Sequence, residues 1–298
     1  MKKIILIPPY HTYGDCLSVI SLLYYLLEYY EIVYFYINPE DFNVVKYYQN
    51  YLHNDTKFNK RILIITDIHK LINSGGYNEY HVCDTSTNDW SGPATKFIDL
   101  PNINKDYYFN DLNPLYNKLN IPDNHRQSPN SHLPNNKLEI NHMFYYKLVG
   151  LNNNVRMDYF NYVRNIEIEK EYKKNILLRY NLGENDKYNI INDPIYSFNQ
   201  VKKYIKNDYP VINISNTSPF VGYLTYLLEG SETIHFVEGN NVNFFYHSQY
   251  KNIFEYDKEI NFHVWVRNRE WKEFNLDKAW KMMSEPKLNK WNFIFEEN

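Results

Sequence analysis

The chain has 298 residues, enough to bury a sizeable core in one large domain or in two domains of Rossmann size. Hydrophobic residues make up 44%, which excludes a disordered composition, and the net charge of -3 argues against a general nucleic-acid binder, which usually presents a basic face. The two cysteines, Cys16 and Cys83, have neither a metal-type spacing nor a disulfide framework, so we expect a reducing, cytoplasmic location.

The first part of the chain alternates between apolar strands and helices. Residues 4–7 form an apolar run that ends at Pro8 and Pro9, which predicts a buried first strand and is too short for a signal-peptide core. No segment reaches the roughly 20 apolar residues of a membrane span, so we expect none. The further elements expected here are strands at 32–37, 61–66 and 80–83 and helices at 16–29 and 44–52.

The pattern weakens over residues 84–136, which are rich in Asn, Asp, Pro and Ser, and we expect long loops there at a substrate-facing rim. A helix is predicted at 137–146, and a helix followed by a strand within 156–180. A second alternating run comes after them. It predicts strands at 190–191, 211–214 and 233–237 and helices at 199–206, 220–228, 241–247 and 276–283.

Two runs of alternating strands and helices predict an α/β protein with two Rossmann-like domains that face each other across a cleft. We place the N-terminal domain in residues 1–150. The C-terminal domain takes residues 151–298. Open parallel sheets bind ligands at the carboxyl ends of their strands, so candidate residues are sought at those ends.

The loop at residues 9–15 follows the first strand and opens a helix. Gly14 allows a tight turn or the close approach of a ligand, and backbone N–H groups at a helix start favour an anion. Asp15 is a candidate general base, but an aspartate at this place also commonly caps a helix, and both interpretations stay open. His11 is a second candidate base, and Tyr13 belongs to the same loop.

The first strand, Gly14-Asp15 and the apolar helix after them resemble the start of the GT-B glycosyltransferases related to the heptosyltransferases. They are also similar to glycosyltransferase-like proteins of phages and large DNA viruses. The resemblance implies a GT-B fold, a role for Asp15 as general base, and a viral protein that works in the host cytoplasm. Tyr13 departs from the pattern, because a small or aliphatic residue is more usual there. Cys16 replaces a branched or basic residue.

A second candidate lies between the two runs, where Arg156, Arg164 and Glu167 recur at helical spacing. Two arginines beside a cleft could clamp a diphosphate with paired hydrogen bonds. The other interpretation is a solvated charged helix with surface ion pairs, which we favour for Glu169 and Glu171. A similar stretch precedes the second domain in the viral and phage proteins that this chain resembles.

A third candidate is the rim of the second domain, where three predicted strands end in polar residues. Hydroxyls, amides and helix starts can hold phosphate oxygens, and a carboxylate such as Glu238 can bind ribose hydroxyls. Ordinary helix capping explains each residue taken singly, and the meeting of three such ends favours a nucleotide pocket. The donor-binding candidates here are Asp193, Ser215, Asn216, Thr217, Ser218, His235, Glu238 and Asn240.

Several motifs are missing from the sequence: a metal-binding Asp-x-Asp in a suitable place, a histidine ligand cluster, a P-loop and a Gly-x-Gly-x-x-Gly loop. The resemblance implies a glycosyltransferase that moves a sugar from a nucleotide-diphosphate donor, bound by the C-terminal domain, to a hydroxyl of a glycan or glycoprotein acceptor, bound by the N-terminal domain. The missing motifs favour a transfer that needs no metal or cofactor, and a single displacement would invert the sugar. The alternatives are a nucleotide-sugar epimerase on the same fold and a noncatalytic scaffold that binds glycans or nucleotides. No nucleic-acid partner is expected.

Overall fold

A computed structural model describes residues 3–8, 13–37, 42–73, 80–85, 108–109, 117, 120–126, 146, 149–152, 154–192, 201–215, 220–237, 240–265 and 291–296. The chain divides into two compact units, Met1–Val163 and Arg164–Asn298. The first unit thus extends past the boundary that we predicted at residue 150. The reason is α7 (Asn154–Asp158), which packs on α2 (Ile20–Leu26) inside the first unit.

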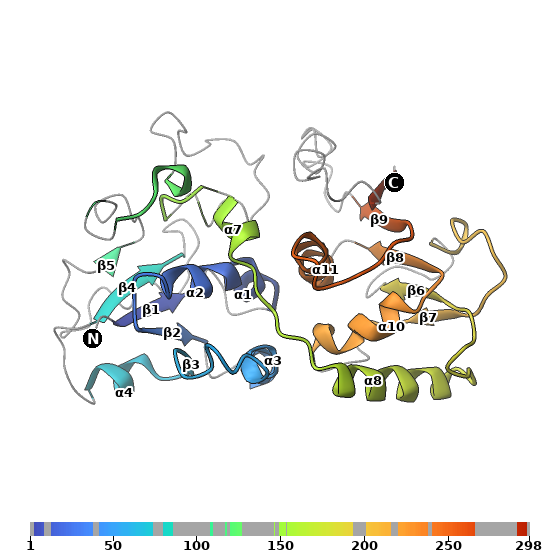
Figure 1. The fold of residues 1–298 in the computed structure, drawn as a ribbon, viewed down its shortest axis with the longest axis horizontal. Coiled ribbons are helices and arrows are strands. Elements are labelled where there is room, and N and C mark those ends of the chain that lie inside the picture. Colours follow the sequence, from blue (N-terminus) through green and yellow to red (C-terminus); the bar gives the residue numbers. More distant parts are fainter. Residues whose placement is uncertain are drawn as a thin grey trace. The chain divides into compact units, whose positions relative to one another are not determined.

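The first unit is built on a five-stranded sheet in the order β3-β2-β1-β4-β5, in which every pair is parallel (Figure 1). The remaining elements of this unit are α1 (Tyr13–Ser18), α3 (Phe42–His53), α4 (Ile68–Asn73) and the short 3-10 helix η4 (Asp123–His125). Its strands are β1 (Lys3–Ile7), β2 (Ile32–Tyr36), β3 (Ile62–Ile65), β4 (Tyr80–Asp84) and β5 (Tyr108–Phe109).

Helices cover both faces of this first sheet. The chain moves outward from β1 to β3 and then returns to β4 on the other side of β1, so right-handed connections must cross on opposite faces. On one face Ile68 of α4 packs with Ile5 and Ile7. On the other face Phe35 meets the ring of Tyr48 from α3, with 5.6 Å between ring centroids. Packing on both faces explains why these strands are almost continuously apolar.

The second unit has a five-stranded sheet of its own, in the order β10-β9-β8-β6-β7, and its pairs are also parallel. Its helical elements are α8 (Ile166–Arg179), η5 (Val221–Leu224), α10 (Thr225–Glu229) and α11 (Asn240–Tyr250). Its strands are β6 (Asn189–Asn192), β7 (Val211–Asn213), β8 (Thr233–Val237), β9 (Ile260–Trp265) and β10 (Trp291–Glu296).

The structure confirms the α/β class with two parallel sheets and corrects several element predictions. The helix expected at 16–29 is two helices, because Val19, with φ -107° and ψ 7°, interrupts it. The strand expected within 156–180 is wrong, because α8 runs to Arg179 and the next strand, β6, begins only at Asn189. Strands β5, β9 and β10 were not predicted. The helices predicted at 137–146 and 276–283 fall almost wholly outside the described residues.

No helix within the described ranges is long and apolar enough to cross a membrane.

Gly230, which follows α10, offers a test of the packing in the second unit. A Cβ atom there would lie 2.8 Å from the Tyr188 hydroxyl oxygen, and that buried hydroxyl donates to the Leu227 carbonyl at 2.8 Å. We expect Gly230→Ala to lower the free energy of unfolding by about 1–3 kcal/mol through overpacking, as measured by urea denaturation. Gly183→Ala is the control, because its Cβ would meet Asp186 at 3.5 Å, an ordinary contact. Equal losses in the two variants would contradict this account.

Candidate functional site

At the carboxyl edge of the first sheet, hydrogen bonds connect the end of β1 to the residue that follows β4. The hydroxyl of Thr85, a buried residue directly after β4, donates to the Ile7 carbonyl at 2.9 Å. The backbone N–H of Thr85 donates to the same carbonyl at 3.1 Å. These two bonds fix the point from which the loop between β1 and α1 departs. His11 belongs to that loop and lies outside the described residues.

Helix α1 begins at Tyr13, three residues earlier than the predicted start at residue 16, so Gly14 and Asp15 lie in its first turn instead of in the loop. Asp15 is thus the third residue of the helix and not its N-cap. The Tyr48 hydroxyl donates to the Tyr13 carbonyl at 2.5 Å. The Tyr13 ring contacts the Tyr47 ring edge-on, with 5.0 Å between centroids. Two neighbouring tyrosines of α3 thus hold the start of α1, and Asp15 lies two residues further along the chain.

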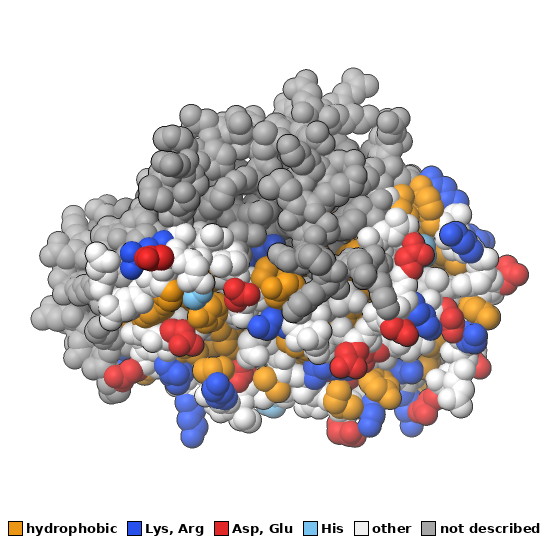
Figure 2. All heavy atoms as spheres, turned by 45° about the horizontal axis from the view of Figure 1, so that its top comes forward, with side chains coloured by type: hydrophobic (Ala, Val, Ile, Leu, Met, Phe, Trp, Pro, Cys, Tyr) orange, Lys and Arg blue, Asp and Glu red, His pale blue; other side chains and the backbone are white. Residues whose placement is uncertain are grey.

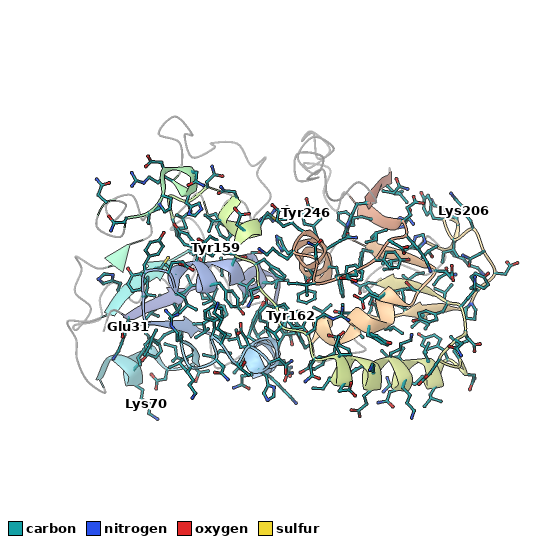
Figure 3. The ribbon with its side chains drawn as sticks, in the orientation of Figure 1. Glu31, Lys70, Tyr159, Tyr162, Lys206 and Tyr246 are labelled. Carbon is teal, nitrogen blue, oxygen red and sulfur yellow. The ribbon has the colours of Figure 1, made fainter. Side chains whose placement is uncertain are left out.

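Arg156 does not lie where we predicted it. Only 2% of its surface is exposed, and it lies in the first unit, where its backbone carbonyl accepts a bond of 2.7 Å from the Ser21 hydroxyl. The end of this segment is held by Tyr159, labelled in Figure 3, whose ring meets the Tyr25 ring with 4.9 Å between centroids. Because α7 packs on α2, the guanidinium is turned away from solvent. We therefore do not keep Arg156 in the proposed site.

The guanidinium of Arg164 is already paired with carboxylates of the second unit. Its Nη2 donates to Oε2 of Glu169 at 2.6 Å, and its Nε donates to Oε1 of the same carboxylate at 3.2 Å. Its Nη1 donates to Oε1 of Glu229 at 2.6 Å. Nη1 also donates to the Ile253 carbonyl at 3.2 Å. The helical spacing predicted from Arg156 to Glu167 is wrong, because Arg164 lies between the separate helices α7 and α8. We do not keep Arg164 as a diphosphate ligand.

Glu169 is buried rather than on the solvated face that we favoured for it. Burial raises the pKa of its carboxyl, and hydrogen bonds and charge from Arg164 oppose that rise. Buried carboxylates are stable in folded proteins when they are paired and hydrogen-bonded, as here. The ion pair therefore ties α8 to α10 and to the segment at residue 253, and it is part of the scaffold of the second unit.

The carboxyl edge of the second sheet brings together polar residues from two strands. The Ser215 hydroxyl donates to the side-chain oxygen of Asn192 at 3.4 Å, and the Ser215 N–H donates to that of Asn213 at 3.0 Å. The Ile214 N–H bonds to the Ile191 carbonyl at 2.9 Å, which continues the ladder past β7. Five of our donor-binding candidates lie outside the described residues: Asp193, Asn216, Thr217, Ser218 and Glu238.

Two further donor-binding candidates belong to β8 and to the helix after it. Asn240 is the first residue of α11, so the connection from β8 reaches a helix start at the carboxyl edge. His235 is instead buried within β8, and its Nδ1 lies 3.1 Å from Nε2 of the buried His263 on β9. Tyr204 covers the His263 ring with 4.9 Å between centroids. His235 therefore belongs to the interior of the sheet rather than to the ligand-facing rim.

Sequence reasoning did not select Thr85, Asn192, Asn213 or His263. A polar residue directly at the end of an apolar strand was the available signal for Thr85, Asn192 and Asn213. For His263 the signal was the alternation of polar and apolar residues over 260–265, which is typical of a strand with one polar face.

Among the described residues, no group of three or more His, Cys, Asp and Glu side chains could hold a metal ion. Figure 2 shows acidic and basic side chains intermixed over the described part of one face.

The Arg164 network predicts a large loss of stability when its cation is removed. Arg164→Met leaves the buried Glu169 carboxylate without its partner, so we expect the free energy of unfolding to fall by about 3–5 kcal/mol. The control is Lys170→Met, which removes an exposed ion pair with Glu167 at 3.3 Å and should change stability by less than about 1 kcal/mol. Chemical denaturation measures both variants, and a similar small change in the two would show that the Arg164 network adds little.

The buried histidine pair predicts a dependence of stability on pH. Burial first and the neighbouring His263 second lower the pKa of His235 from 6.5 to about 3. Between these values the unfolded chain binds a proton at His235 and the folded chain does not, so stability falls as the pH drops from about 6.5 towards 3. In His235→Asn this slope should be shallower by up to about 1.4 kcal/mol per pH unit. Parallel wild-type and variant curves in urea denaturation at pH 4 to 7 would refute this.

A solved structure described as "the glycosyl transferase family 9 from Veillonella parvula DSM 2008" is similar to this chain. The TM-score is 0.51 and the sequence identity is 9%, over 99% of this chain and 86% of that one. No protein-family model matches the sequence. A search of curated proteins gave no significant match. At this identity the similarity is one of fold.

Proposed function

We propose that this protein is a glycosyltransferase of the GT-B kind, which transfers a sugar from a nucleotide-diphosphate donor to a hydroxyl group. One observation carries the proposal: the similarity to a solved glycosyl transferase structure extends over 99% of the chain and so includes both parallel sheets. An arrangement of the two domains on either side of a cleft is part of the proposal. So are a cytoplasmic location and a viral origin, which rest on the sequence alone.

The donor would bind at the carboxyl edge of the second sheet. In support, Asn192, Asn213 and Ser215 come together there, and α11 begins at the same edge. Asparagine and serine side chains both donate and accept hydrogen bonds, which suits the hydroxyls and amides of a nucleoside. The neighbouring polar residues named in the sequence would complete the set, namely Asp193, Asn216, Thr217, Ser218 and Glu238.

The acceptor would bind at the carboxyl edge of the first sheet, with Asp15 as the general base. The oxygen of the acceptor hydroxyl forms a bond to the anomeric carbon of the sugar, and the Asp15 carboxylate takes the proton that this oxygen loses. The bond from that carbon to the diphosphate oxygen breaks, and the leaving group keeps the electron pair. A single displacement of this kind inverts the anomeric centre. His11 is the other group in this loop that could accept the proton.

The leaving diphosphate would be stabilised by backbone N–H groups, because Arg156 is buried in the first unit and Arg164 is paired with two carboxylates. The N–H groups at the start of α11 point out of the helix, and the helix dipole adds a partial positive charge there. Donors fixed in advance stabilise the charge that develops in the transition state without further reorganisation. The reaction proposed needs neither a cofactor nor a metal, and the nucleotide-sugar is a co-substrate.

The proposal predicts that binding and turnover separate in Asp15→Asn. We expect one of UDP-, GDP- or CDP-sugars to raise the melting temperature of both the wild type and the variant, because a ligand of the folded state stabilises it. Transfer or slow hydrolysis of that donor should fall by at least about 100-fold in the variant, as expected for loss of a general base. Product analysis by mass spectrometry measures both reactions.

Three results would count against this proposal. Unchanged turnover in Asp15→Asn would remove Asp15 from the mechanism. Conversion of the donor to an isomer without an acceptor would indicate an epimerase. Donor binding with no turnover in the wild type would indicate a noncatalytic scaffold.

A further inference from the structure

Four aromatic rings pack together in the first unit, where α2 ends and the chain turns back towards β2. Tyr25 belongs to α2 and Tyr29 to the turn after it, while His125 comes from η4 and Tyr159 directly follows α7. We call these four residues the ring cluster. Because α2 leads from the carboxyl edge of the parallel sheet back to its amino edge, the cluster lies at the opposite end of this connection from Asp15.

Three rings of the cluster have nearly perpendicular planes. Tyr25 and Tyr159 lie 4.9 Å apart between centroids at 86°, and His125 and Tyr159 lie 5.8 Å apart at 87°. The Tyr25 and His125 rings complete the set, with 5.6 Å between centroids at 73°. Tyr25 is fully buried, whereas Tyr29, His125 and Tyr159 are partly exposed. Partly exposed rings set at right angles around a buried one resemble the aromatic cages that hold organic cations.

Acidic side chains lie beside the ring cluster. Burial first, and the charge of Glu28 after it, raise the pKa of Tyr159, and Asp158 adds to this rise. Burial also raises the pKa of Tyr29, a hydrogen bond with Tyr25 opposes the rise, and the charge of Glu28 adds to it. On the left of Figure 2, hydrophobic side chains and a histidine lie on one surface with acidic side chains next to them. Negative charge beside negative ring faces favours a cation.

The cations of this part of the protein do not fill that role. The Glu28 carboxylate is exposed and forms no ion pair with a described residue. Arg126 bonds to the Asp123 carboxylate at 3.0 Å, and Arg61 donates to two carbonyls in the turn after α2, both at 2.8 Å. Within the described ranges, no Lys or Arg side chain lies over the ring of Tyr29 or Tyr159.

The ring cluster is held in place by contacts that need no ligand. The His125 carbonyl accepts a bond of 2.8 Å from the Asn152 N–H, and the Asn154 side chain donates to the carbonyl before it at 3.1 Å. The Tyr29 hydroxyl donates to the Tyr25 hydroxyl at 3.3 Å. Rings that are ordered in advance lose less conformational entropy when a ligand binds.

We propose that the ring cluster binds a small organic cation with a methylated ammonium group, in contact with Tyr29 and Tyr159 and with Glu28 as the counter-charge. The methyl groups of such a cation bury apolar surface against the rings, while its positive charge is attracted by the ring faces. A primary ammonium is more strongly hydrated and loses more on leaving water. This site does not depend on the transfer reaction proposed above.

The test measures binding of choline to the full chain by isothermal titration calorimetry. The neutral isostere of choline, in which carbon replaces the nitrogen, should bind at least about 10-fold more weakly, since it lacks the charge. Ethanolamine, the unmethylated analogue, should also bind more weakly than choline. We expect Glu28→Gln to weaken choline binding about 3- to 10-fold. Glu31→Gln is the matched control, because it removes an exposed carboxylate three residues further along the chain (labelled in Figure 3) and should have no effect.

The rings are tested by a second pair of variants. Tyr29→Leu removes a partly exposed ring and should weaken choline binding about 3- to 10-fold, whereas Tyr29→Phe keeps the ring and should stay within about 2-fold of the wild type. Tyr209→Leu, which removes an exposed tyrosine of the second unit, should bind choline like the wild type. Circular dichroism checks that each variant is folded.

Four results would overturn the inference. The first is the absence of saturable choline binding by the wild type. Equal affinity for choline and its neutral isostere would show an apolar surface without a role for charge, and equal affinity for ethanolamine would exclude selection of a methylated group. Equal losses in Glu28→Gln and Glu31→Gln would assign the effect to net charge. Because Glu28 is exposed, its variant keeps the proposal open to refutation even if Tyr29→Leu fails to fold.

Discussion

Parallel pairing is the constraint on which the architecture of both units depends. Every strand runs in the same direction as its neighbours in the sheet, so the chain must return to the opposite edge after each strand. The segments that leave the carboxyl ends therefore gather at one edge of each sheet. Thr85, Asn192 and Ser215 all lie at these edges, where their side chains form hydrogen bonds.

The charged and titratable groups show how strongly burial decides what a residue can do. Arg164 has the chemistry to bind a diphosphate, but two carboxylates of its own unit occupy the guanidinium. His235 has the chemistry of a proton carrier, but burial beside His263 keeps it neutral at physiological pH. Asn213 and Ser215 are weaker ligands taken singly, yet they lie at the carboxyl edge, where open parallel sheets generally bind ligands. Position in the fold thus outweighs the intrinsic chemistry of the side chain.

The sequence predicted most strands of the first sheet, because β1 and β2 are continuous apolar runs bounded by turns. It did not predict β9, whose polar residues Asn261 and His263 are buried between β8 and β10, two strands that come from other parts of the sequence. The partner of Arg164, Glu229, lies 65 residues away, and no local spacing could have indicated it. Long-range pairing and polar side chains inside a sheet are the features that local patterns miss.

On either side of the boundary between the two units, one residue forms hydrogen bonds within its own unit. Asn161 donates to the Asp55 carboxylate at 2.9 Å and its carbonyl accepts the Tyr51 hydroxyl bond, all within the first unit. Arg164, three residues later, bonds only within the second unit in the contacts described above. The chain is therefore anchored in each unit by separate bonds on the two sides of Val163. An insertion at Val163 would therefore leave the bonds of Asn161 and those of Arg164 in place.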